Sequence, residues 1–126
     1  MLVYRICRAK YARDLSGSGA EKAGGRWNSK GIPMLYASGS IALATTELAV
    51  HLPLGQLPSD FELISIEIPD EEIKSIDLKN LPTDWQNFPH SASTQALGDA
   101  FAIKSKHLVL RVPSAVIPQE FNYFLS

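Results

Sequence analysis

The sequence predicts one α+β domain in which mixed or antiparallel strands are joined by a few helices. Three observations support this prediction. The chain has 126 residues, a length typical of a single domain. Its strand-like and helix-like segments do not follow a regular β-α-β alternation, which favours an α+β fold over a doubly wound sheet. No internal repeat, low-complexity tract or linker interrupts the chain, so we expect the domain to span residues 1–126.

The first third of the chain contains two expected strands and a long connection between them. Residues 2–7 are a short apolar run with Arg5 inside it, which predicts a strand. Residues 8–30 contain several glycines and small or charged residues and show no sustained period. A structureless connection of this length is uncommon in a compact domain and tends to be functional. Strand character returns over residues 32–38.

A helix and a third strand are expected next. Ser40 has a side chain that suits an N-cap, and the pattern after it predicts a helix over residues 41–52 that Pro53 ends. Residues 61–68 alternate between apolar and polar side chains. This alternation predicts a half-buried strand, with Pro69 at its end.

The rest of the chain is expected to contain one more helix and up to three strands. Residues 73–78 are a candidate strand, and residues 81–89 form a turn-rich link. Ser93 is a candidate cap for a helix that runs to about residue 104, although Gly98 weakens its interior. The last strands are expected at residues 107–112 and 121–125.

Composition and charge are those of an ordinary globular protein. Hydrophobic residues make up 45% of the chain and charged residues 20%, unlike the composition of a disordered protein. The formal net charge is −1. Proteins that bind nucleic acid usually have a basic excess, because their affinity depends on neutralising phosphates. We therefore expect no direct binding of DNA or RNA.

The sequence also predicts neither a metal centre nor a membrane segment. Cys7 is the only cysteine, and the three histidines do not show a metal-ligand spacing. The first residues do not form a charged leader followed by an apolar stretch, so no signal peptide is expected. No run approaches the ~20 apolar residues that span a bilayer. We expect a cytoplasmic protein with no metal and no membrane contact.

Residues 24–28, Gly-Gly-Arg-Trp-Asn, are the most informative local feature. The two glycines allow the backbone to approach a ligand closely. Arg26 offers a planar fork of donors that matches phosphate oxygens. Alternatively, the segment is a surface turn in which Arg26 points into water and Trp27 anchors the loop to the core. The segment matches neither a Walker loop nor a Gly-x-Gly-x-x-Gly motif.

Glu47 is the only carboxylate of the helix expected over residues 41–52. By the 3.6-residue period it shares a face with Leu43 and Val50, whose side chains would partly desolvate it. A second, apolar face is expected to point into the core; it consists of Ile41, Ala44, Leu48 and Leu52. Glu47 is either a functional carboxylate or one that is solvated or paired with a nearby cation.

Tyr36 lies in the strand that leads into this helix. It is either a core or edge tyrosine with a hydrogen-bonded hydroxyl, or a ring that stacks on a flat, positively charged ligand such as nicotinamide. Arg5, among apolar strand residues, is either exposed at an edge or held in a cleft with an anionic partner. Asp84 and Asp99 are either general acids or surface and capping residues, and we favour the second interpretation. We interpret His51 as a partner of the helix C-terminal dipole.

Short motifs occur in a defined order along nearly the whole chain. They are Tyr4-Arg5-Ile6, Gly25-Arg26-Trp27-Asn28, Leu35-Tyr36-Ala37-Ser38, Ala44-x-x-Glu47, Leu81-Pro82-x-x-Trp85, Thr94-Gln95-x-x-Gly98-Asp99 and Val112-Pro113-Ser114-Ala115-Val116-x-Pro118-x-x-x-Asn122-Tyr123. Each motif is weak alone, but the ordered set is specific. It resembles the RES-domain toxins of bacterial RES–Xre toxin–antitoxin modules.

This resemblance implies a fold similar to that of the ADP-ribosyltransferases and an activity that destroys NAD. The arginine, tyrosine and glutamate of the family's active site match Arg26, Tyr36 and Glu47. We expect NAD to be a substrate rather than a cofactor. The expected substrate-binding residues are Arg5, Gly25, Asn28 and Ser114, of which Ser114 has an open role.

The chemistry of this hypothesis is glycosidic cleavage. Breaking the nicotinamide–ribose bond builds positive charge on the ribose, which a carboxylate stabilises. Glu47 would supply that charge and hydrogen-bond a ribose hydroxyl. Arg26 and Arg5 would hold the phosphates, and Tyr36 would pack against the nicotinamide ring. Water or inorganic phosphate would then attack the ribose, and the sequence does not separate these two acceptors.

Two other functions stay open from the sequence. One is transfer of ADP-ribose from NAD to a protein, and the other is a non-catalytic interaction module. The resemblance also implies an inhibitory partner, an Xre-type antitoxin with a helix-turn-helix DNA-binding domain. A homodimer of this chain is one arrangement within such a complex.

Overall fold

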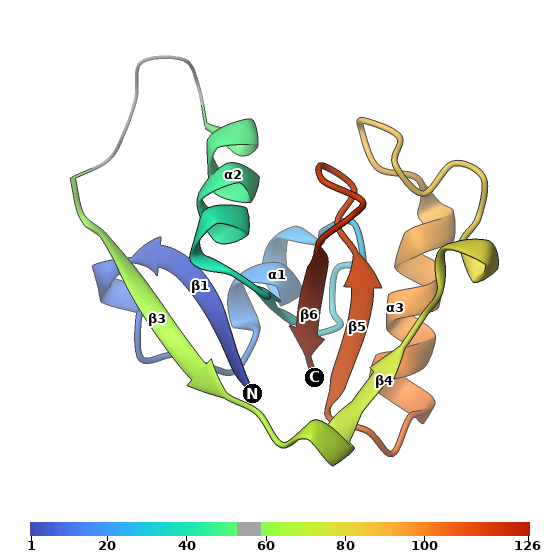
Figure 1. Ribbon diagram of the computed structural model, residues 1–126, viewed down its shortest axis with the longest axis horizontal. Coiled ribbons are helices and arrows are strands. Elements are labelled where there is room, and N and C mark those ends of the chain that lie inside the picture. Colours follow the sequence, from blue (N-terminus) through green and yellow to red (C-terminus); the bar gives the residue numbers. More distant parts are fainter. Residues whose placement is uncertain (53–58) are drawn as a thin grey trace.

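The computed structural model describes residues 1–52 and 59–126. Within these two stretches the chain forms six strands and three α-helices (Figure 1). In order they are β1 (Leu2–Arg8), α1 (Ser18–Ala23), β2 (Leu35–Ser38), α2 (Ile41–His51), β3 (Phe61–Glu67), β4 (Ile73–Ser75), α3 (Ala92–Lys104), β5 (Val109–Pro113) and β6 (Phe121–Leu125). Short 3-10 turns occur at Ala9–Tyr11, Asp70–Glu72 and Leu78–Asn80.

The six strands form one mixed sheet in the order β3-β1-β2-β6-β5-β4. Strand β4 pairs with β5 in parallel, and the other neighbouring strands are antiparallel. The α+β class expected from the sequence is therefore confirmed. The two edge strands, β3 and β4, follow one another in the chain and are joined by the turn at Asp70–Glu72, which crosses between the two edges (Figure 1).

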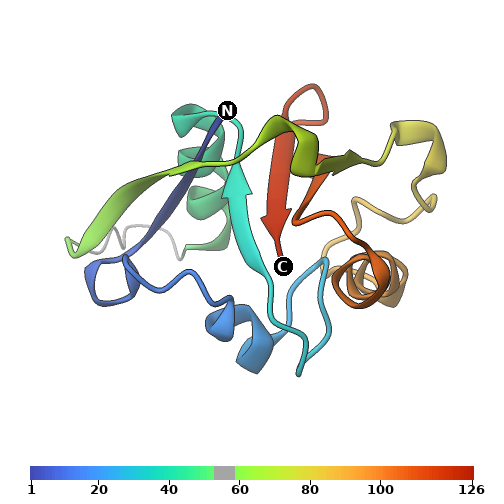
Figure 2. The same ribbon diagram turned by 90° about the horizontal axis from the view of Figure 1, so that it is seen from below.

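Each face of the curled sheet buries its own hydrophobic cluster, because successive side chains on a strand point to opposite faces. Helices α1 and α3 lie on the same side of the sheet (Figure 2). That side buries Trp27, Met34, Trp85, Phe101, Leu110, Val112 and Phe124. The other cluster consists of Val3, Leu35, Ala37, Ile66, Ile68, Val109 and Tyr123.

Helix α2 begins where the sequence predicts, and its buried face agrees with the expected one only in part. The Ser40 side chain accepts a hydrogen bond from the Leu43 N–H at 3.0 Å, which confirms the expected N-cap. The buried residues of α2 are Leu43 and Ala44, whereas Ile41 is 47% exposed. Of the expected core face, Ala44 is buried and Leu48 and Leu52 are half-buried. The place of Ile41 is wrong, because the helix is rolled so that Leu43 packs inward instead. Pro53, the expected helix terminator, lies outside the described residues.

Three other expectations require correction. Residues 8–30 were expected to be structureless, but they contain the turn at Ala9–Tyr11 and helix α1. The candidate strand over 73–78 is shorter, since β4 ends at Ser75. Helix α3 has Ser91 rather than Ser93 at its N-cap, because the Ser93 hydroxyl donates to Asp84 Oδ1 at 2.6 Å instead. Among the described residues, no helix is long and apolar enough to cross a membrane.

Candidate active site

A cleft opens where strands β1 and β2 separate. Strand β1 pairs with β3 along its whole length but with β2 only at Tyr4 and Ser38. Farther along, the Arg5 side chain spans the gap, and its Nη1 donates to the Tyr36 carbonyl oxygen at 3.2 Å. The separation of two neighbouring strands thus exposes side chains that a continuous sheet would cover.

Helix α2 borders this opening and divides it into two connected cavities. The smaller, of about 190 Å³, lies between α2 and the strands β1 and β2. The larger, of about 460 Å³, extends toward residues 24–27 and 88–90. Both cavities are lined by Tyr36, Glu47, His51, Asn122 and Phe124. The larger volume falls in the range of about 300–1,000 Å³ found for small-molecule sites.

Glu47 stands at the junction of the two cavities, and its carboxylate is held by two side-chain donors. Ser114 Oγ donates to Glu47 Oε1 at 2.6 Å, and Asn122 Nδ2 donates to the same oxygen at 2.7 Å. Within the part of the chain that the structure describes, no hydrogen bond reaches Glu47 Oε2. One carboxylate oxygen is therefore fixed, and the other is free to accept a hydrogen bond from a ligand.

The two donors are themselves held in one orientation. Ser114 Oγ accepts the N–H groups of Val116 and Ile117 at 3.1 and 3.0 Å, so its proton is directed to Glu47. Asn122 Oδ1 accepts the hydroxyl proton of Ser38 at 2.9 Å, which turns its amide nitrogen toward Glu47. Ser38, Ser114 and Asn122 are all buried. They form a pre-arranged support for the carboxylate.

Tyr36 forms part of the cleft wall through its ring and fixes the neighbouring loop through its hydroxyl. The hydroxyl donates to Asn28 Oδ1 at 2.6 Å and accepts the Trp27 N–H at 2.9 Å. The ring packs on Phe124 with centroids 4.7 Å apart. Desolvation raises the pKa of Tyr36 far above its ordinary value, with the hydrogen bond from Trp27 as a smaller opposing effect. The hydroxyl therefore stays protonated and is a donor, not a base.

Arg26 lies across the larger cavity from Glu47 and is held by backbone carbonyls. Its Nη1 donates to the carbonyl oxygens of Trp85 and Asn87, both at 2.9 Å. Its guanidinium carbon lies 4.4 Å from the centre of the Phe88 ring. Desolvation lowers the pKa of Arg26, and the negative charge of Glu47 opposes that shift. An arginine remains cationic after such a shift, so the larger cavity contains a fixed cation, Arg26, and a carboxylate, Glu47.

Helix α3 holds the loop that carries Arg26. Gln95 Nε2 donates to the Gly25 and Asn28 carbonyl oxygens at 3.0 and 3.2 Å. Asp99 accepts the N–H and the hydroxyl of Ser29 at 2.9 and 2.5 Å. A Cβ on Gly98 would lie 1.6 Å from the Trp27 carbonyl oxygen. Gly98 is therefore the residue that lets the helix reach the loop, which explains its unfavourable place inside a helix.

The structure brings the three expected catalytic residues to one cavity. Arg26, Tyr36 and Glu47 all line the larger one, as does Gly25. Arg5 lines the smaller cavity. Its Nε is buried and has no hydrogen-bond partner among residues 1–52 and 59–126, which leaves Arg5 a spare donor.

Two of the expected substrate-binding residues lie beneath the cleft surface. Asn28 is fully buried, and its Nδ2 donates to the carbonyl oxygens of Ala20 and Ile32 at 2.8 and 2.9 Å. Ser114 is also fully buried. Neither residue lines the two cavities, so each acts through a neighbour: Asn28 through Tyr36 and Ser114 through Glu47.

Sequence reasoning missed several residues of the cleft. Asn122 and Ser38 belong to the motifs singled out above, but nothing in the sequence assigns them to Glu47. His51 was assigned to the helix dipole, and it lines both cavities. Phe88 lies in a link that reads only as turn-rich. No group of three or more histidine, cysteine, aspartate or glutamate side chains that would hold a metal ion occurs in the described stretches.

Known proteins are similar to this chain over most or all of its length. The RES domain family matches residues 2–126. Proteins named Toxin Res from Photorhabdus laumondii and Yersinia enterocolitica are each 39% identical to the chain over 127 residues. The alignment covers all of this chain and 81% and 84% of the two relatives. A protein named Prs ADP-ribosylating toxin from a Sphingobium species is 39% identical over 122 residues, which are 94% of this chain and 76% of that protein.

Proposed function

The chain belongs to the RES domain family, and on that basis we propose that it is a toxin that breaks the nicotinamide–ribose bond of NAD. One observation carries the proposal: Arg26, Tyr36 and Glu47 line the same cavity. The Glu47 carboxylate there has one oxygen fixed by Ser114 and Asn122. These are the groups that the cleavage of a cationic glycoside requires.

The proposed reaction begins with loss of nicotinamide. The bond between the ribose C1′ and the pyridine nitrogen breaks, and nicotinamide leaves as a neutral molecule with the electron pair. The ribose then has oxocarbenium character, which the negative charge of Glu47 stabilises. Its free Oε2 accepts a hydrogen bond from a ribose hydroxyl. No strong general acid is needed, since the leaving group requires no proton.

The other residues position the substrate. Arg26 offers its guanidinium to a phosphate, because Trp85 and Asn87 hold only its Nη1. Arg5 lines the smaller cavity and adds a second cation for the phosphates there. The Tyr36 ring packs against the nicotinamide. Water or inorganic phosphate completes the reaction by forming a bond to C1′ and losing a proton to solvent.

Transfer of ADP-ribose to a protein is the second candidate. The observation that favours it is the name of the Sphingobium relative, an ADP-ribosylating toxin that is 39% identical to this chain. Both reactions begin with the same bond cleavage and differ in the acceptor. The same cleft residues therefore serve either one.

The experiment that separates these functions uses NAD labelled in its adenylate half. Purified protein is incubated with this NAD, and both free nicotinamide and protein-bound label are measured. We expect free nicotinamide with soluble labelled ADP-ribose, or ADP-ribose 1″-phosphate when phosphate is present. Label transferred to protein would favour the transferase. NAD that stays intact would contradict both enzymatic functions and would favour a non-catalytic interaction module.

An activity that destroys NAD harms its own cell, so we also propose a cytoplasmic location and an inhibitory antitoxin partner. Relatives that carry the name Toxin Res support this part of the proposal. The expected partner has a helix-turn-helix domain that supplies the DNA contact. Co-expression tests it: growth arrest by this chain should disappear when the neighbouring gene is present, and persistent arrest would contradict the proposal.

A further inference from the structure

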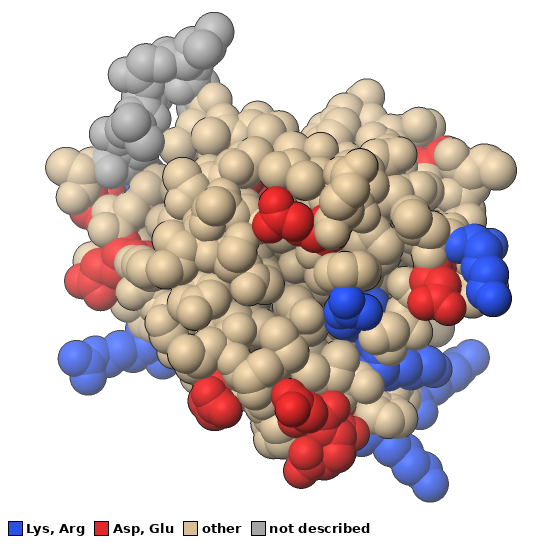
Figure 3. Space-filling view, in the orientation of Figure 1, with Lys and Arg blue, Asp and Glu red and all other residues tan. Residues whose placement is uncertain are grey.

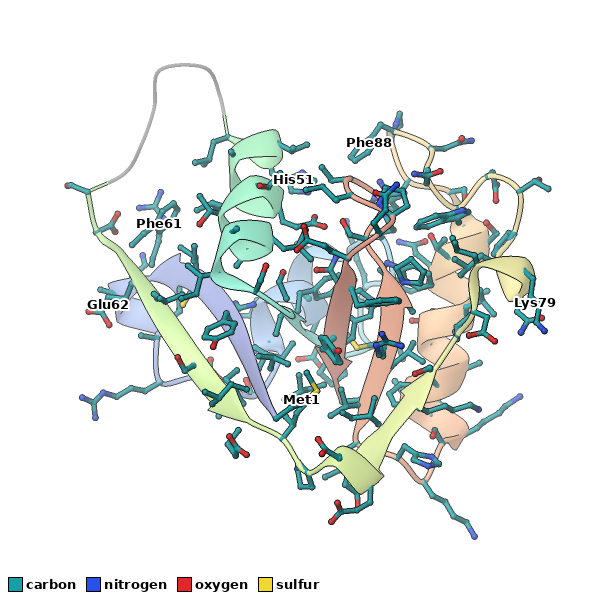
Figure 4. The ribbon with its side chains drawn as sticks, viewed as in Figure 1. Met1, His51, Phe61, Glu62, Lys79 and Phe88 are labelled. Atoms are coloured by element: carbon teal, nitrogen blue, oxygen red, sulfur yellow. The ribbon has the colours of Figure 1, made fainter. Side chains whose placement is uncertain are left out.

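Two aromatic side chains face one another at the mouth of the cleft. Phe88 comes from the segment before α3, and His51 comes from the last turn of α2. Figure 4 shows them pointing toward each other from these two elements. Their ring centroids are 6.2 Å apart, and the rings are tilted by 45°. Both residues line the larger cavity.

Phe88 is 56% exposed, although its segment is firmly held. Arg26 donates to the carbonyl oxygens of two residues just before Phe88, those of Trp85 and Asn87. The ring also lies over the Arg26 guanidinium at 4.4 Å. An exposed phenyl ring fixed in this way gains little from burial in the protein itself. Its exposed surface is available to a ligand in the larger cavity.

We propose that His51 and Phe88 form an aromatic clamp that holds the adenine base of NAD at the mouth of the cleft. This inference rests on the proposed function, because it assigns a site to the half of the substrate that does not react. Two rings that enclose a flat base lie about 7 Å apart, twice the contact distance between carbon atoms. The observed rings are 6.2 Å apart and tilted by 45°, so the two exposed side chains must turn parallel and move apart by about 1 Å to admit the base.

The charge at the clamp favours adenine over nicotinamide. Phe88 already lies against the cationic Arg26 guanidinium. The nicotinamide ring of NAD carries a positive charge, so a second cation there would be repelled, whereas adenine is neutral. A phosphate held by Arg26 would also lie beside the base that Phe88 stacks. Base stacking on aromatic side chains is a common mode of nucleotide binding.

The surface around the clamp supports stacking rather than ion pairing. Residues 85–98 contain no Asp, Glu, Lys or Arg, and residues 31–52 contain only Glu47. Figure 3 shows the same distribution, with Lys and Arg side chains mainly toward the lower and right-hand margins of this face. His51 follows Glu47 by one helical turn on α2. One helix therefore contacts both the reacting ribose and the clamp.

The test compares two mononucleotides that differ only in their base. Adenosine monophosphate and nicotinamide mononucleotide share a ribose and a phosphate. A substitution that acts through Arg26 and the phosphate therefore changes the affinity for both. Dissociation constants are measured by calorimetry on the Glu47→Gln protein, in which turnover is suppressed, together with that of NAD. Phe88→Ala is expected to raise the dissociation constants of adenosine monophosphate and NAD roughly tenfold. That of nicotinamide mononucleotide should rise less than about twofold. His51→Ala is expected to act in the same direction by about threefold.

Two further variants control for indirect effects. Phe88→Trp keeps an aromatic face and should retain affinity for adenosine monophosphate. Phe61→Ala removes another phenyl ring in contact with an arginine: Phe61, at the start of β3, has the Arg8 guanidinium carbon 5.7 Å from its ring centre. Phe61 lies away from the cleft, so this variant should bind all three ligands with unchanged affinity.

Each outcome distinguishes the clamp from the proposed function. Equal weakening of both mononucleotides by Phe88→Ala would overturn the clamp, since Phe88 would then act through Arg26. Unchanged affinity for adenosine monophosphate would overturn it as well. In both cases the unmutated protein would still release nicotinamide from NAD. If that protein releases none and binds none of the three ligands, the proposed function fails together with the clamp.

Discussion

The two sides of the cleft hold their charged groups in different ways. On the carboxylate side, Glu47 on α2 is held by the side chains of Ser114 and Asn122. On the arginine side, Arg26 is held by the backbone carbonyls of Trp85 and Asn87. The carboxylate side therefore depends on a few side chains near the ends of regular strands. The arginine side depends on the shape of two loops.

Because of this difference, substitutions on the two sides should affect different properties of the protein. Removal of one donor on the carboxylate side changes the freedom of Glu47 while the surrounding strands stay paired. On the arginine side, contacts from α3 hold the loop, so a change there alters packing first. We expect variants of the carboxylate side to lower the turnover rate, and variants of the arginine side to lower the stability of the fold.

The largest effect is expected on the arginine side, from Gly98→Ala. The added Cβ would lie 1.6 Å from the Trp27 carbonyl oxygen, so α3 and the loop must move apart. We expect a loss of about 3 kcal/mol or more in the free energy of unfolding, measured in denaturant. An unfolding midpoint like that of the unmutated protein would mean that the loop is not held by close packing on α3.

Ser114→Ala and Asn122→Ala test the carboxylate side. Each removes one donor to Glu47 Oε1, and a hydrogen bond to a charged group contributes ~1.5–3 kcal/mol. We expect kcat for nicotinamide release to fall by a factor of about ten or more, with little change in KM. In the double variant, kcat should fall by less than the product of the two single-variant factors, because both donors restrain the same oxygen. A rise in KM alone would contradict the positioning role.

Tyr36→Phe separates the two parts of the same residue. It keeps the ring in the cleft and removes the hydroxyl that joins Trp27 and Asn28. Because two buried partners lose a hydrogen bond, we expect a loss of about 1–3 kcal/mol in stability. The folded variant should still release nicotinamide at a measurable rate. Full stability with lost activity would instead give the hydroxyl a chemical role.

The smallest effect is expected from Asp84, which ties the segment of Phe88 to α3. The hydrogen bond from Ser93 lowers the pKa of this half-buried carboxyl group. A lowered pKa in the folded state stabilises the fold at neutral pH, and that stability is lost as the pH falls below about 4. Asp84→Asn should therefore unfold at a slightly lower temperature at pH 7, and the difference should shrink in acid. A difference independent of pH would contradict this origin.

Local signals made much of the fold predictable from sequence. The bounds of β6 agree with the expected strand over 121–125, and Ser40 caps α2 as its side chain suggests. Helix α1 could not be predicted, because it has only six residues and contains Gly19. Helix α2 was oriented correctly only in part, since Ala44 is buried as expected and Ile41 is not. Its roll is set by the strands beneath it, so Leu43 is buried while Val50 is 49% exposed.

The candidate site was predictable as a set of residues but not as a network. The sequence singles out Glu47 without the hydrogen bonds that hold it, because Ser114 and Asn122 lie about seventy residues away. Asn28 was expected to contact substrate, whereas it lies buried below Tyr36. Gly98 was recognised only as a weak helix residue. Its close approach to Trp27 becomes visible only in three dimensions.

The central claim is that the Glu47 carboxylate stabilises the cleavage of NAD. It is tested most directly by the rate of nicotinamide release from NAD, compared between the unmutated protein and Glu47→Gln at matched folded concentration. Glutamine keeps the shape and removes the charge. The account predicts a rate at least ~100-fold lower for the variant, with an unfolding temperature close to that of the unmutated protein. Nicotinamide release at the same rate by both proteins would contradict it.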